Sequence, residues 1–442
     1  MRFLGVTETC DLGSLYMRLL GEGHEVKVFV EDEGAQGTMA GLVPRTEDWR
    51  GELGWVGRDG IVLFEAVSEG YGALQDELRA DGYSVIGGSA FGDRLENDRA
   101  YAQGVLAGLG LRTAGVREFD DAAAGDAFLA ARPGRYVLKF SGPDFSSSDN
   151  YVGQRRDGAD VRAMLAARFR ARGGEPASYI LMDYVDGVEM GVGAYFDGDR
   201  FLEPACLDWE HKRFFAGDMG ELTGEMGTVA TYQSSDRFFD RTLARMAPLL
   251  REHRHVGYVN LNTIVNADGI WPLEFTCRFG YPGFAVLEPL QAIPWGDLLG
   301  AMAGRSAAAF PVHPGFSVGI VLTTPPFPYS RKQVGEPVGL PILLDPAPSA
   351  ADLSNLHFGE VGLEGGHLVT SGLYGWTMVV TGTGPDIAAA RRAAYGRAGR
   401  IFIPGVRYRL DIGDRLIAGD YDAVAGLGLL SHESAGTASA ER

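Results

Sequence analysis

The chain has few cysteines and few lysines for its 442 residues. Its three cysteines, Cys10, Cys206 and Cys277, stand far apart and form neither a zinc-binding pattern nor a disulfide framework, so the sequence predicts a reducing compartment. Only four of the 40 basic residues are lysines, at positions 27, 139, 212 and 332. A lysine kept where a chain otherwise uses arginine indicates a need for a compact ammonium group.

The chain also lacks basic net charge and long apolar runs. Its formal net charge of −18 argues against nucleic acid or an anionic membrane as the partner, because both require a basic surface. The longest apolar runs have strand length, far below the roughly 20 residues of a membrane span, and no signal-peptide pattern begins at Met1. We therefore expect a cytoplasmic enzyme for small molecules, a monomer or homodimer, with roughly two to four domains.

The first part of the chain alternates between strand and helix patterns. Strand patterns occur in MRFLGV, HEVKVFV, GIVLFEA and YSVIGG, and helical patterns cover residues 12–20 and 71–80. This alternation predicts a doubly wound parallel sheet.

The middle of the chain mixes helices with strands that end in polar turns. Helices are predicted over residues 95–109 and 237–252. The strand pattern RYVLKFSG leads into the polar loop SGPDFSSSDN, and YVNLNTIV and IWPLEFTCRFG are joined by a hairpin turn at residues 266–269. The later segment, rich in proline, contains strand patterns and a helix over residues 385–401, which predicts a smaller α+β unit.

Several of these stretches together carry a resemblance to one family. They are LENDRAYAQ, YVLKF, DYVDGVE, DWEHKRFFAGD followed by TGEMG, and LEFTCRFGYP, with SVGIVLTT and HLVTSGLYGWTMVVTGTG near the end. In this order they resemble glycinamide ribonucleotide synthetase, also called phosphoribosylamine–glycine ligase, a purine-biosynthesis family of the ATP-grasp class.

The resemblance implies a fold and an activity. It implies an N-terminal Rossmann-like substrate domain at residues 1–93, an ATP-grasp domain at 94–305 with a lid at about 113–185 and an α+β C-terminal domain at 306–430. The polar composition of residues 431–442 predicts a disordered tail. The implied activity is that of a carboxylate–amine ligase: ATP, with Mg²⁺ or Mn²⁺, phosphorylates a carboxylate such as glycine, and an amine attacks the acyl phosphate.

The resemblance also assigns residues to the nucleotide. It implies phosphate contacts from Arg99, Lys139 and Lys212, adenine contacts from the backbone of Met182 and Asp183, and a ribose contact from Glu189. The plainer interpretation is a solvated surface side chain, and it applies to Arg99, Lys139, Lys212 and Glu189.

The predicted magnesium ligands are Glu274, Thr276 and Asn262, by resemblance to the class. Residues two apart in a strand point to the same face, so Glu274 and Thr276 can address one ion. Only one of the three is a carboxylate, which predicts a weakened metal site.

Two further motifs leave alternatives open. The resemblance places Arg278 near the substrate carboxylate or the acyl phosphate, whereas the structural alternative is a pair with Glu288. Ser146, Ser147 and Ser148 lie where the family has its phosphate-binding loop, and their hydroxyls and amides suit phosphate, but a plain polar loop is the alternative.

The N-terminal turns that hold phosphoribosylamine in the family are missing here. VTETCDLGS follows the first strand, and FEAVSEGYG stands where the second turn is expected. Asp11 is predicted to cap the first helix. The acceptor amine is therefore open, and a catalytically inactive nucleotide-binding sensor or scaffold is the alternative function.

Overall fold

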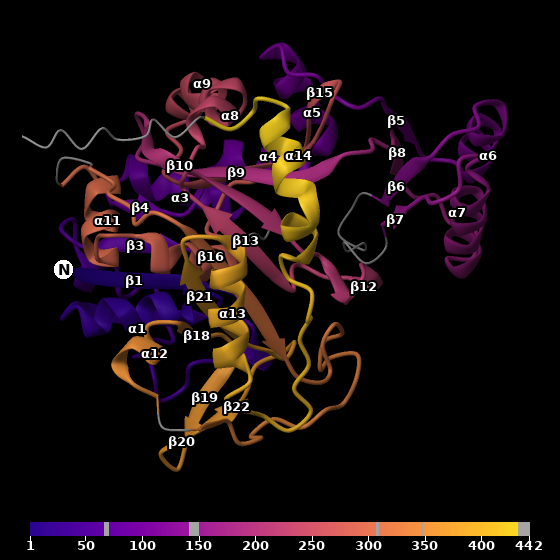
Figure 1. The fold of residues 1–442 in the computed structure, drawn as a ribbon. Helices are drawn as coiled ribbons and strands as arrows, with labels where there is room; N and C mark the ends of the chain where they lie inside the picture. Colours follow the sequence, from indigo (N-terminus) through magenta and orange to yellow (C-terminus); the bar gives the residue numbers. More distant parts are fainter. Residues whose placement is uncertain (66–69, 141–149, 306–308, 346–347, 432–442) are drawn as a thin grey trace, which may run out of the picture.

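A computed structural model of the chain describes residues 1–65, 70–140, 150–305, 309–345 and 348–431, with only the backbone of residues 350 and 351. These residues form a body with a lid that projects from it (Figure 1). None of the helices in these ranges combines the length and the apolar composition that crossing a bilayer requires.

The N-terminal region is a parallel sheet of four strands in the order β2-β1-β3-β4. Such strands require crossover connections, which here are mostly helical. The sheet is buried on both faces, as parallel sheets are, and Ile61–Phe64 is buried throughout. The predicted doubly wound sheet is confirmed. Its elements are β1 (Arg2–Thr7), α1 (Gly13–Gly21), β2 (Glu25–Val30), η1 (Glu33–Ala35), α2 (Leu53–Val56), β3 (Ile61–Phe64), α3 (Tyr71–Ala80) and β4 (Val85–Ile86).

The helix predicted over residues 95–109 is in fact two helices, α4 (Ala90–Asn97) and α5 (Arg99–Gly108). The chain breaks at Asp98, whose backbone is extended and whose side chain accepts a hydrogen bond from the amide of Tyr101 at 2.9 Å. Aspartate is a favoured helix N-cap because it satisfies a free amide of the first turn. The break makes Arg99 the first residue of a new helix.

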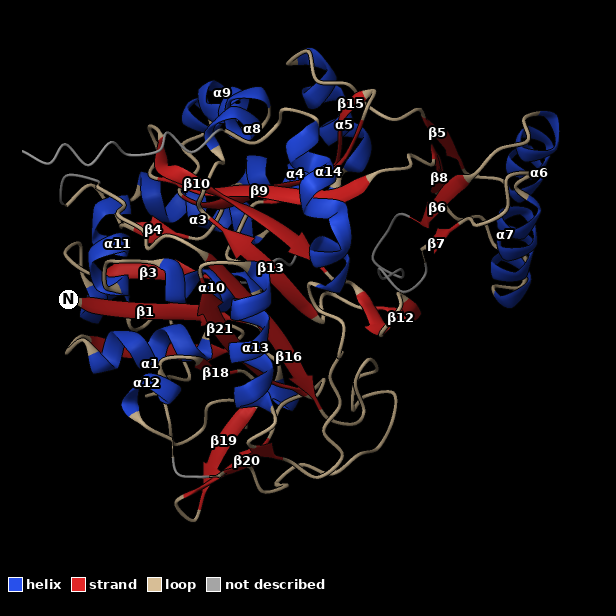
Figure 2. Cartoon of the chain, in the orientation of Figure 1, coloured by secondary structure: helices blue, strands red, loops and turns tan. Residues whose placement is uncertain are grey.

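The lid is a separate antiparallel sheet in the order β5-β8-β6-β7. Helices α6 and α7 lie on one side of this sheet, away from the body (Figure 2). Its own apolar core includes Leu129, Leu138, Leu165 and Tyr179. The lid elements are β5 (Val116–Phe119), α6 (Ala122–Ala131), β6 (Tyr136–Phe140), β7 (Tyr151–Val152), α7 (Ala159–Ala171) and β8 (Tyr179–Asp183).

A sheet of eight strands forms the centre of the body, in the order β15-β14-β9-β10-β13-β16-β21-β18. All of its neighbouring strands are antiparallel, and the predicted hairpin turn at residues 266–269 is confirmed. Its strands are β9 (Val188–Phe196), β10 (Phe201–Glu210), β13 (Gly227–Thr231), β14 (Gly257–Asn266), β15 (Gly269–Thr276), β16 (Phe316–Thr323), β18 (Leu356–Phe358) and β21 (Trp376–Gly384).

Short helices cover the central sheet. The helix predicted over residues 237–252 is divided into three short pieces, the first two parted at Thr242, whose backbone is not helical. The covering helices are α8 (Asp236–Arg241), η3 (Leu243–Met246), α9 (Ala247–Glu252), α10 (Gly283–Leu287), η4 (Glu288–Leu290), α11 (Trp295–Met302) and α13 (Ile387–Ala398).

The C-terminal region is α+β, as predicted, but three of its strands continue the central sheet, because β16 pairs with β13. The predicted domain limits at residues 93, 305 and 430 stay predictions. The remaining elements are β11 (Arg213–Phe215), β12 (Met219–Leu222), β17 (Leu343–Leu344), α12 (Ala350–Leu353), β19 (Val361–Glu364), β20 (His367–Thr370), β22 (Ile401–Phe402), η5 (Leu416–Asp420) and α14 (Tyr421–Gly426).

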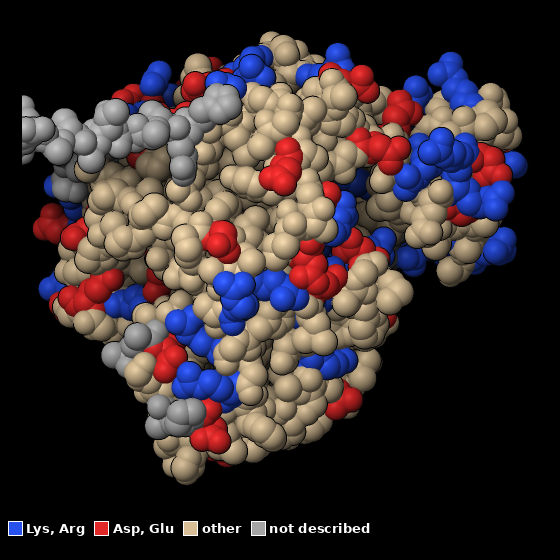
Figure 3. Space-filling view, viewed as in Figure 1, with Lys and Arg blue, Asp and Glu red and all other residues tan. Residues whose placement is uncertain are grey.

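Charge is distributed unevenly between the lid and the body. Residues 113–185 hold ten basic and ten acidic residues, so the net charge of −18 lies outside the predicted lid. Figure 3 shows basic side chains gathered on the lid and a hollow between the lid and the body.

Candidate active site

Glu274 of β15 lies at the centre of a cluster of basic side chains. Its Oε2 is 2.7 Å from Nη1 of Arg99 and 3.7 Å from Nζ of Lys139. Its Oε1 is 2.7 Å from Nζ of Lys212. The attraction of Lys212, followed by that of Lys139 and Arg99, holds the pKa of Glu274 well below its usual range despite burial. The structure thus brings four predicted site residues together.

Lys139 connects the lid to the body. It lies in β6, its side chain is 14% exposed, and it reaches across to Glu274. Burial lowers its pKa to about 8, although Glu274 favours the charged form, because Arg99 and Lys212 repel it as well. The alternative of a solvated surface lysine is therefore wrong.

Lys212 joins the cluster to two more acids. Its Nζ is 3.1 Å from Oε2 of Glu210 and 3.5 Å from Oε1 of Glu189, and its pKa is raised well above the usual range, because these acids and Glu274 outweigh its burial. Glu189 accepts a hydrogen bond of 2.7 Å from Nδ2 of Asn262. The predicted ribose, phosphate and metal residues are thus in continuous contact.

The predicted metal ligands lie together on the β14–β15 hairpin. Asn262 pairs directly with Glu274 across the hairpin, and Thr276 lines the same cavity as both. In the described part of the chain, no three Asp, Glu, His or Cys side chains form a group that could hold a metal ion alone. One carboxylate, one hydroxyl and one amide oxygen suit Mg²⁺ only if phosphate and water complete its octahedron. Together with the surrounding cations, they fit a magnesium-bound triphosphate.

Two cavities meet at this cluster. The larger, of about 510 Å³, lies between lid and body and is lined by Tyr184 and Glu189, among others. The smaller, of about 230 Å³, lies within the body and is lined by Glu274 and Arg278, among others. Lys212 and Glu210 line both cavities. The basic cluster therefore stands where a nucleotide held on one side would meet a substrate held on the other.

The predicted adenine residues lie in the central strand of the lid sheet. Met182 pairs with Val116 on one side and Val137 on the other, and the amide of Asp183 donates to the carbonyl of Gly115 at 2.9 Å. The side chain of Asp183 pairs with Arg117 at 3.0 Å. The next residue, Tyr184, lines the larger cavity, and the adenine contact stays a prediction.

Arg278 lies beyond the end of β15, which stops at Thr276, so the strand is shorter than the pattern IWPLEFTCRFG predicted. Its Nη2 is 3.1 Å from Oε1 of Glu96. Glu288, the structural partner considered from the sequence, instead pairs with Arg18 at 2.6 Å. Arg278 still lines the smaller cavity together with Glu274.

Three acids of the smaller cavity were missed from the sequence. Asp208, Glu210 and Glu225 all line it. They stand in the stretches DWEHKR and TGEMG, both of which carry the family resemblance. Those stretches were the available signal, because they place three acids beside a predicted phosphate-binding lysine.

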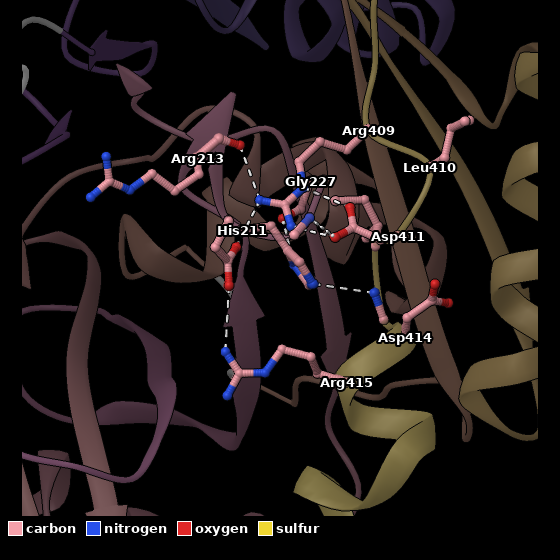
Figure 4. A network of polar contacts seen from close by, with 12 residues as sticks. His211, Arg213, Gly227, Arg409, Leu410, Asp411, Asp414 and Arg415 are labelled. Carbon is pink, nitrogen blue, oxygen red and sulfur yellow. Dashed lines mark hydrogen bonds and ion pairs between the residues drawn. The ribbon is translucent and has the colours of Figure 1, made fainter. Parts of the chain in front are cut away.

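A polar network fixes the segment that carries Lys212 (Figure 4). The amide of Gly413 donates to Nε2 of His211 at 3.2 Å, so Nδ1 carries the proton and donates to the carbonyl of Gly227 at 3.2 Å. Burial lowers the pKa of His211, which agrees with a neutral ring. Arg409, nearby, donates to the carbonyl of Arg213 at 3.0 Å. The C-terminal segment therefore holds both neighbours of Lys212.

The serines Ser146, Ser147 and Ser148 of the predicted phosphate loop lie outside the described residues. Asp11 is described, and it does not cap α1, which has Leu12 at its N-cap. Asp11 instead accepts a hydrogen bond of 2.8 Å from Thr9.

Comparison with known proteins assigns the family. Residues 97–284 match the family model described as phosphoribosylglycinamide synthetase, ATP-grasp (A) domain. The phosphoribosylamine–glycine ligase of Mycobacterium bovis is 31% identical over 379 residues, which cover 82% of this chain and 85% of that protein. The chain belongs to the phosphoribosylamine–glycine ligase family. The Neisseria meningitidis serogroup B phosphoribosylamine–glycine ligase is 26% identical over 354 residues, with 78% of this chain and 81% of the relative covered.

Solved structures agree on the fold of this phosphoribosylamine–glycine ligase family member. A phosphoribosylamine–glycine ligase from Thermotoga maritima superposes with a TM-score of 0.70 at 20% identity, covering 93% of this chain and 100% of the other. A biotin carboxylase from Campylobacter jejuni superposes with a TM-score of 0.61 at 11% identity, with 96% of each chain covered. The matched residues 97–284 contain every site residue that the sequence predicted.

Proposed function

We propose that this chain is an ATP-dependent ligase that joins a carboxylate to an amine. The observation that supports this most is the convergence of Arg99, Lys139 and Lys212 on Glu274 at the junction of two cavities. Phosphoryl transfer needs little covalent chemistry from the protein and depends on positioning and on stabilising charge. Three cations around one metal-compatible acid provide that charge.

The reaction proceeds in two displacements. A carboxylate oxygen of the first substrate attacks the terminal phosphorus of ATP, and the bond to ADP breaks. The nitrogen of the amine then attacks the acyl carbon, phosphate leaves with the bonding electrons, and the amine gives up a proton. Arg99, Lys139 and Lys212 would hold the phosphate oxygens, Arg278 would orient the carboxylate, and Glu274 with Thr276 and Asn262 would hold magnesium, which neutralises phosphate charge when bound.

The test is release of ADP from ATP and Mg²⁺ or Mn²⁺ with amino acids as carboxylates and a panel of amines, followed by mass spectrometry of the product. We expect ADP release that requires both substrates and a product joined by an amide bond. Release of ADP that needs neither substrate, or a product without the new bond, would contradict the proposal.

The acceptor amine in this proposal is not phosphoribosylamine, the substrate named for the relatives. Oε2 of Glu65, at the end of β3, accepts a hydrogen bond of 2.6 Å from the amide of Leu12 at the start of α1. Its Oε1 accepts another of 2.9 Å from the hydroxyl of Tyr16. A buried carboxyl group of the protein thus occupies an amide that an anionic ligand would use.

A direct comparison of acceptors tests this part. Phosphoribosylamine generated in the assay should support less ADP release, with glycine as the carboxylate, than the best amine without a phosphate group. Phosphoribosylamine as the better acceptor would show that the purine-pathway reaction is retained.

The alternative is a nucleotide-binding protein without catalysis. It is favoured by one observation: Glu274 is the sole carboxylate of the predicted metal set, and three cations already contact it. Calorimetric binding of ATP without turnover for any pair of substrates would support this alternative over the ligase.

A further inference from the structure

Two acids of the smaller cavity, Asp208 and Glu225, form no ion pair with any of the described residues. Glu225 is 6% exposed and Asp208 is 7% exposed. Within the described ranges, Oε1 of Glu225 and Oδ1 of Asp208 have no hydrogen-bond partner. A buried, unpaired carboxylate is costly, so such groups are expected to have a counter-charge in the working protein.

The basic residues of the cavity are engaged elsewhere. Lys212 pairs with Glu274, Glu210 and Glu189, although it also attracts both acids from a distance. Arg278 pairs with Glu96. Across the described residues, neither Asp208 nor Glu225 takes part in an ion pair, and the one Lys or Arg at the other positions is Arg442.

The pKa values of the two acids reflect the lack of an ion pair. Burial raises the pKa of Asp208 to about 7, with Glu210 adding to the rise. Burial raises the pKa of Glu225 well above its usual range, and the charges of Glu210 and Asp208 raise it further. A bound cation would restore the charged form of both.

The rest of the cavity wall suits an organic cation better than a metal ion. No group of three potential metal-ligating acids, histidines or cysteines is present in the described part of the chain. Tyr281 and Trp376 line the cavity with ring centroids 5.2 Å apart, and aromatic faces attract ammonium and guanidinium groups. The hydroxyl of Tyr281 and that of the buried Thr228 are also without partners among the residues described.

The wall of the cavity therefore presents both cations and acids. Arg278 suits a substrate carboxylate, and the two acids without an ion pair suit two positive groups. Its volume of about 230 Å³ is many times the roughly 10–15 Å³ that a cavity needs to hold one water. Glycine carries a single ammonium, whereas a basic amino acid carries two cations.

We propose that Asp208 and Glu225 bind the cationic groups of the carboxylate substrate, which is a basic amino acid. This inference rests on the proposed ligase function, because it assigns the smaller cavity to the carboxylate that is phosphorylated.

Binding measured separately from turnover tests the inference. The probes are three pairs matched in length: lysine with norleucine, ornithine with norvaline, and 2,4-diaminobutyrate with 2-aminobutyrate. Each is titrated calorimetrically into the full chain with Mg²⁺ and a non-hydrolysable ATP analogue. We expect at least one basic amino acid to bind roughly tenfold to hundredfold more tightly than its neutral partner, because a hydrogen bond between charged groups contributes that much affinity.

Isosteric variants connect that preference to the two acids. Glu225→Gln and Asp208→Asn keep the side-chain shape and should each reduce the preference about tenfold. Their unfolding midpoints confirm that they fold, which is expected because each replaces a buried acid without an ion pair by a neutral amide. The control is Glu203→Gln, an exposed glutamate on the same strand as Asp208, which should leave the preference unchanged.

The outcomes separate the two proposals. Neutral amino acids that bind as tightly as their basic partners in all three pairs overturn the inference, and so does an undiminished preference in both isosteric variants. A clear preference without ADP release, for any amine, retains the cation site and rejects the ligase. ADP release that favours neutral amino acids retains the ligase and rejects the cation site.

Discussion

At the scale of single residues, the charge of Glu274 balances three cations. Glu274→Gln should abolish ADP release, a loss of at least about a hundredfold, because magnesium loses its only protein carboxylate. The variant should also lose about 1–3 kcal/mol of unfolding free energy, since three basic groups are left without their shared acid. Steady-state assays and urea unfolding measure the two effects.

The matched control for this change is Glu118→Gln, at an exposed glutamate of the lid strand β5. It should leave both quantities within error. Full ADP release by Glu274→Gln would show that this acid does not hold the metal.

Lys139 gives a second residue-scale prediction, on pH. Its pKa of about 8 means that the ligand-free protein loses this positive charge as the pH rises through 8. Affinity for ATP should therefore be constant below that pH and fall above it, by up to about tenfold per pH unit. The fall ends at the higher pKa that Lys139 has when phosphate is bound beside it. Lys139→Arg should remove the fall, because arginine stays charged. Calorimetry at pH 7 and 9 compares the two proteins, and parallel curves would contradict the role of Lys139.

At the scale of elements, the β11–β12 hairpin depends on one buried arginine from the C-terminal segment. The side chain of Arg409 is 1% exposed and pairs with Asp218 at 3.0 Å and with Asp411 at 2.8 Å. Arg409→Met should cost about 1–3 kcal/mol of unfolding free energy, because it removes the ion pair with the partly buried Asp411 and the hydrogen bond to the carbonyl of Arg213. It should also raise the KM for ATP, since the hairpin adjoins Lys212.

The control for this prediction is a second arginine that pairs with Asp218. Arg415 also pairs with Asp218, at 3.5 Å, but its side chain is 64% exposed. Arg415→Met should change the unfolding free energy by less than about 1 kcal/mol, as exposed pairs do. Equal effects of the two variants in urea unfolding would show that burial of Arg409 is not what holds the hairpin.

The element scale also shows what the sequence can and cannot predict. The parallel strands and the β14–β15 hairpin follow from local apolar patterns and turn residues, which the chain carries within a few positions. The break at Asp98 was missed because the apolar pattern continues through it, and only the capping bond to Tyr101 reveals it. The motifs predicted which residues belong to the site. They did not predict that Arg278 pairs with Glu96, because this contact joins two segments that are far apart in the sequence.

At the scale of the whole molecule, Glu65 links folding to pH. Burial raises its pKa from 4.5 to about 8. Between these values the unfolded chain ionises first, so the free energy of unfolding falls as the pH rises, by up to about 1.4 kcal/mol per pH unit. Glu65→Gln has no such pH dependence at this position. Its free energy of unfolding, measured with urea, should therefore rise relative to that of the original protein from pH 5 to pH 8. A constant difference between the two proteins would show that Glu65 titrates normally.

The smaller cavity is itself a property of the whole molecule. Asp11 comes from the N-terminal region, Glu225 from the segment before β13, and Trp376 from the C-terminal region. No motif read along the chain predicts that these three residues share a wall, because tertiary packing alone brings them together.

The continuous central sheet limits which parts of this chain can be exchanged with those of a relative. A fragment of residues 94–305, cut at the limits that the sequence suggests, would lack β16, which pairs with β13. Strand β13 would then be an exposed edge of the sheet, and exposed edges promote aggregation. The lid has its own sheet and its own apolar core, so it is the natural piece to graft. Chimeras with related ligases should therefore survive a transplanted lid and fail when the C-terminal third is swapped.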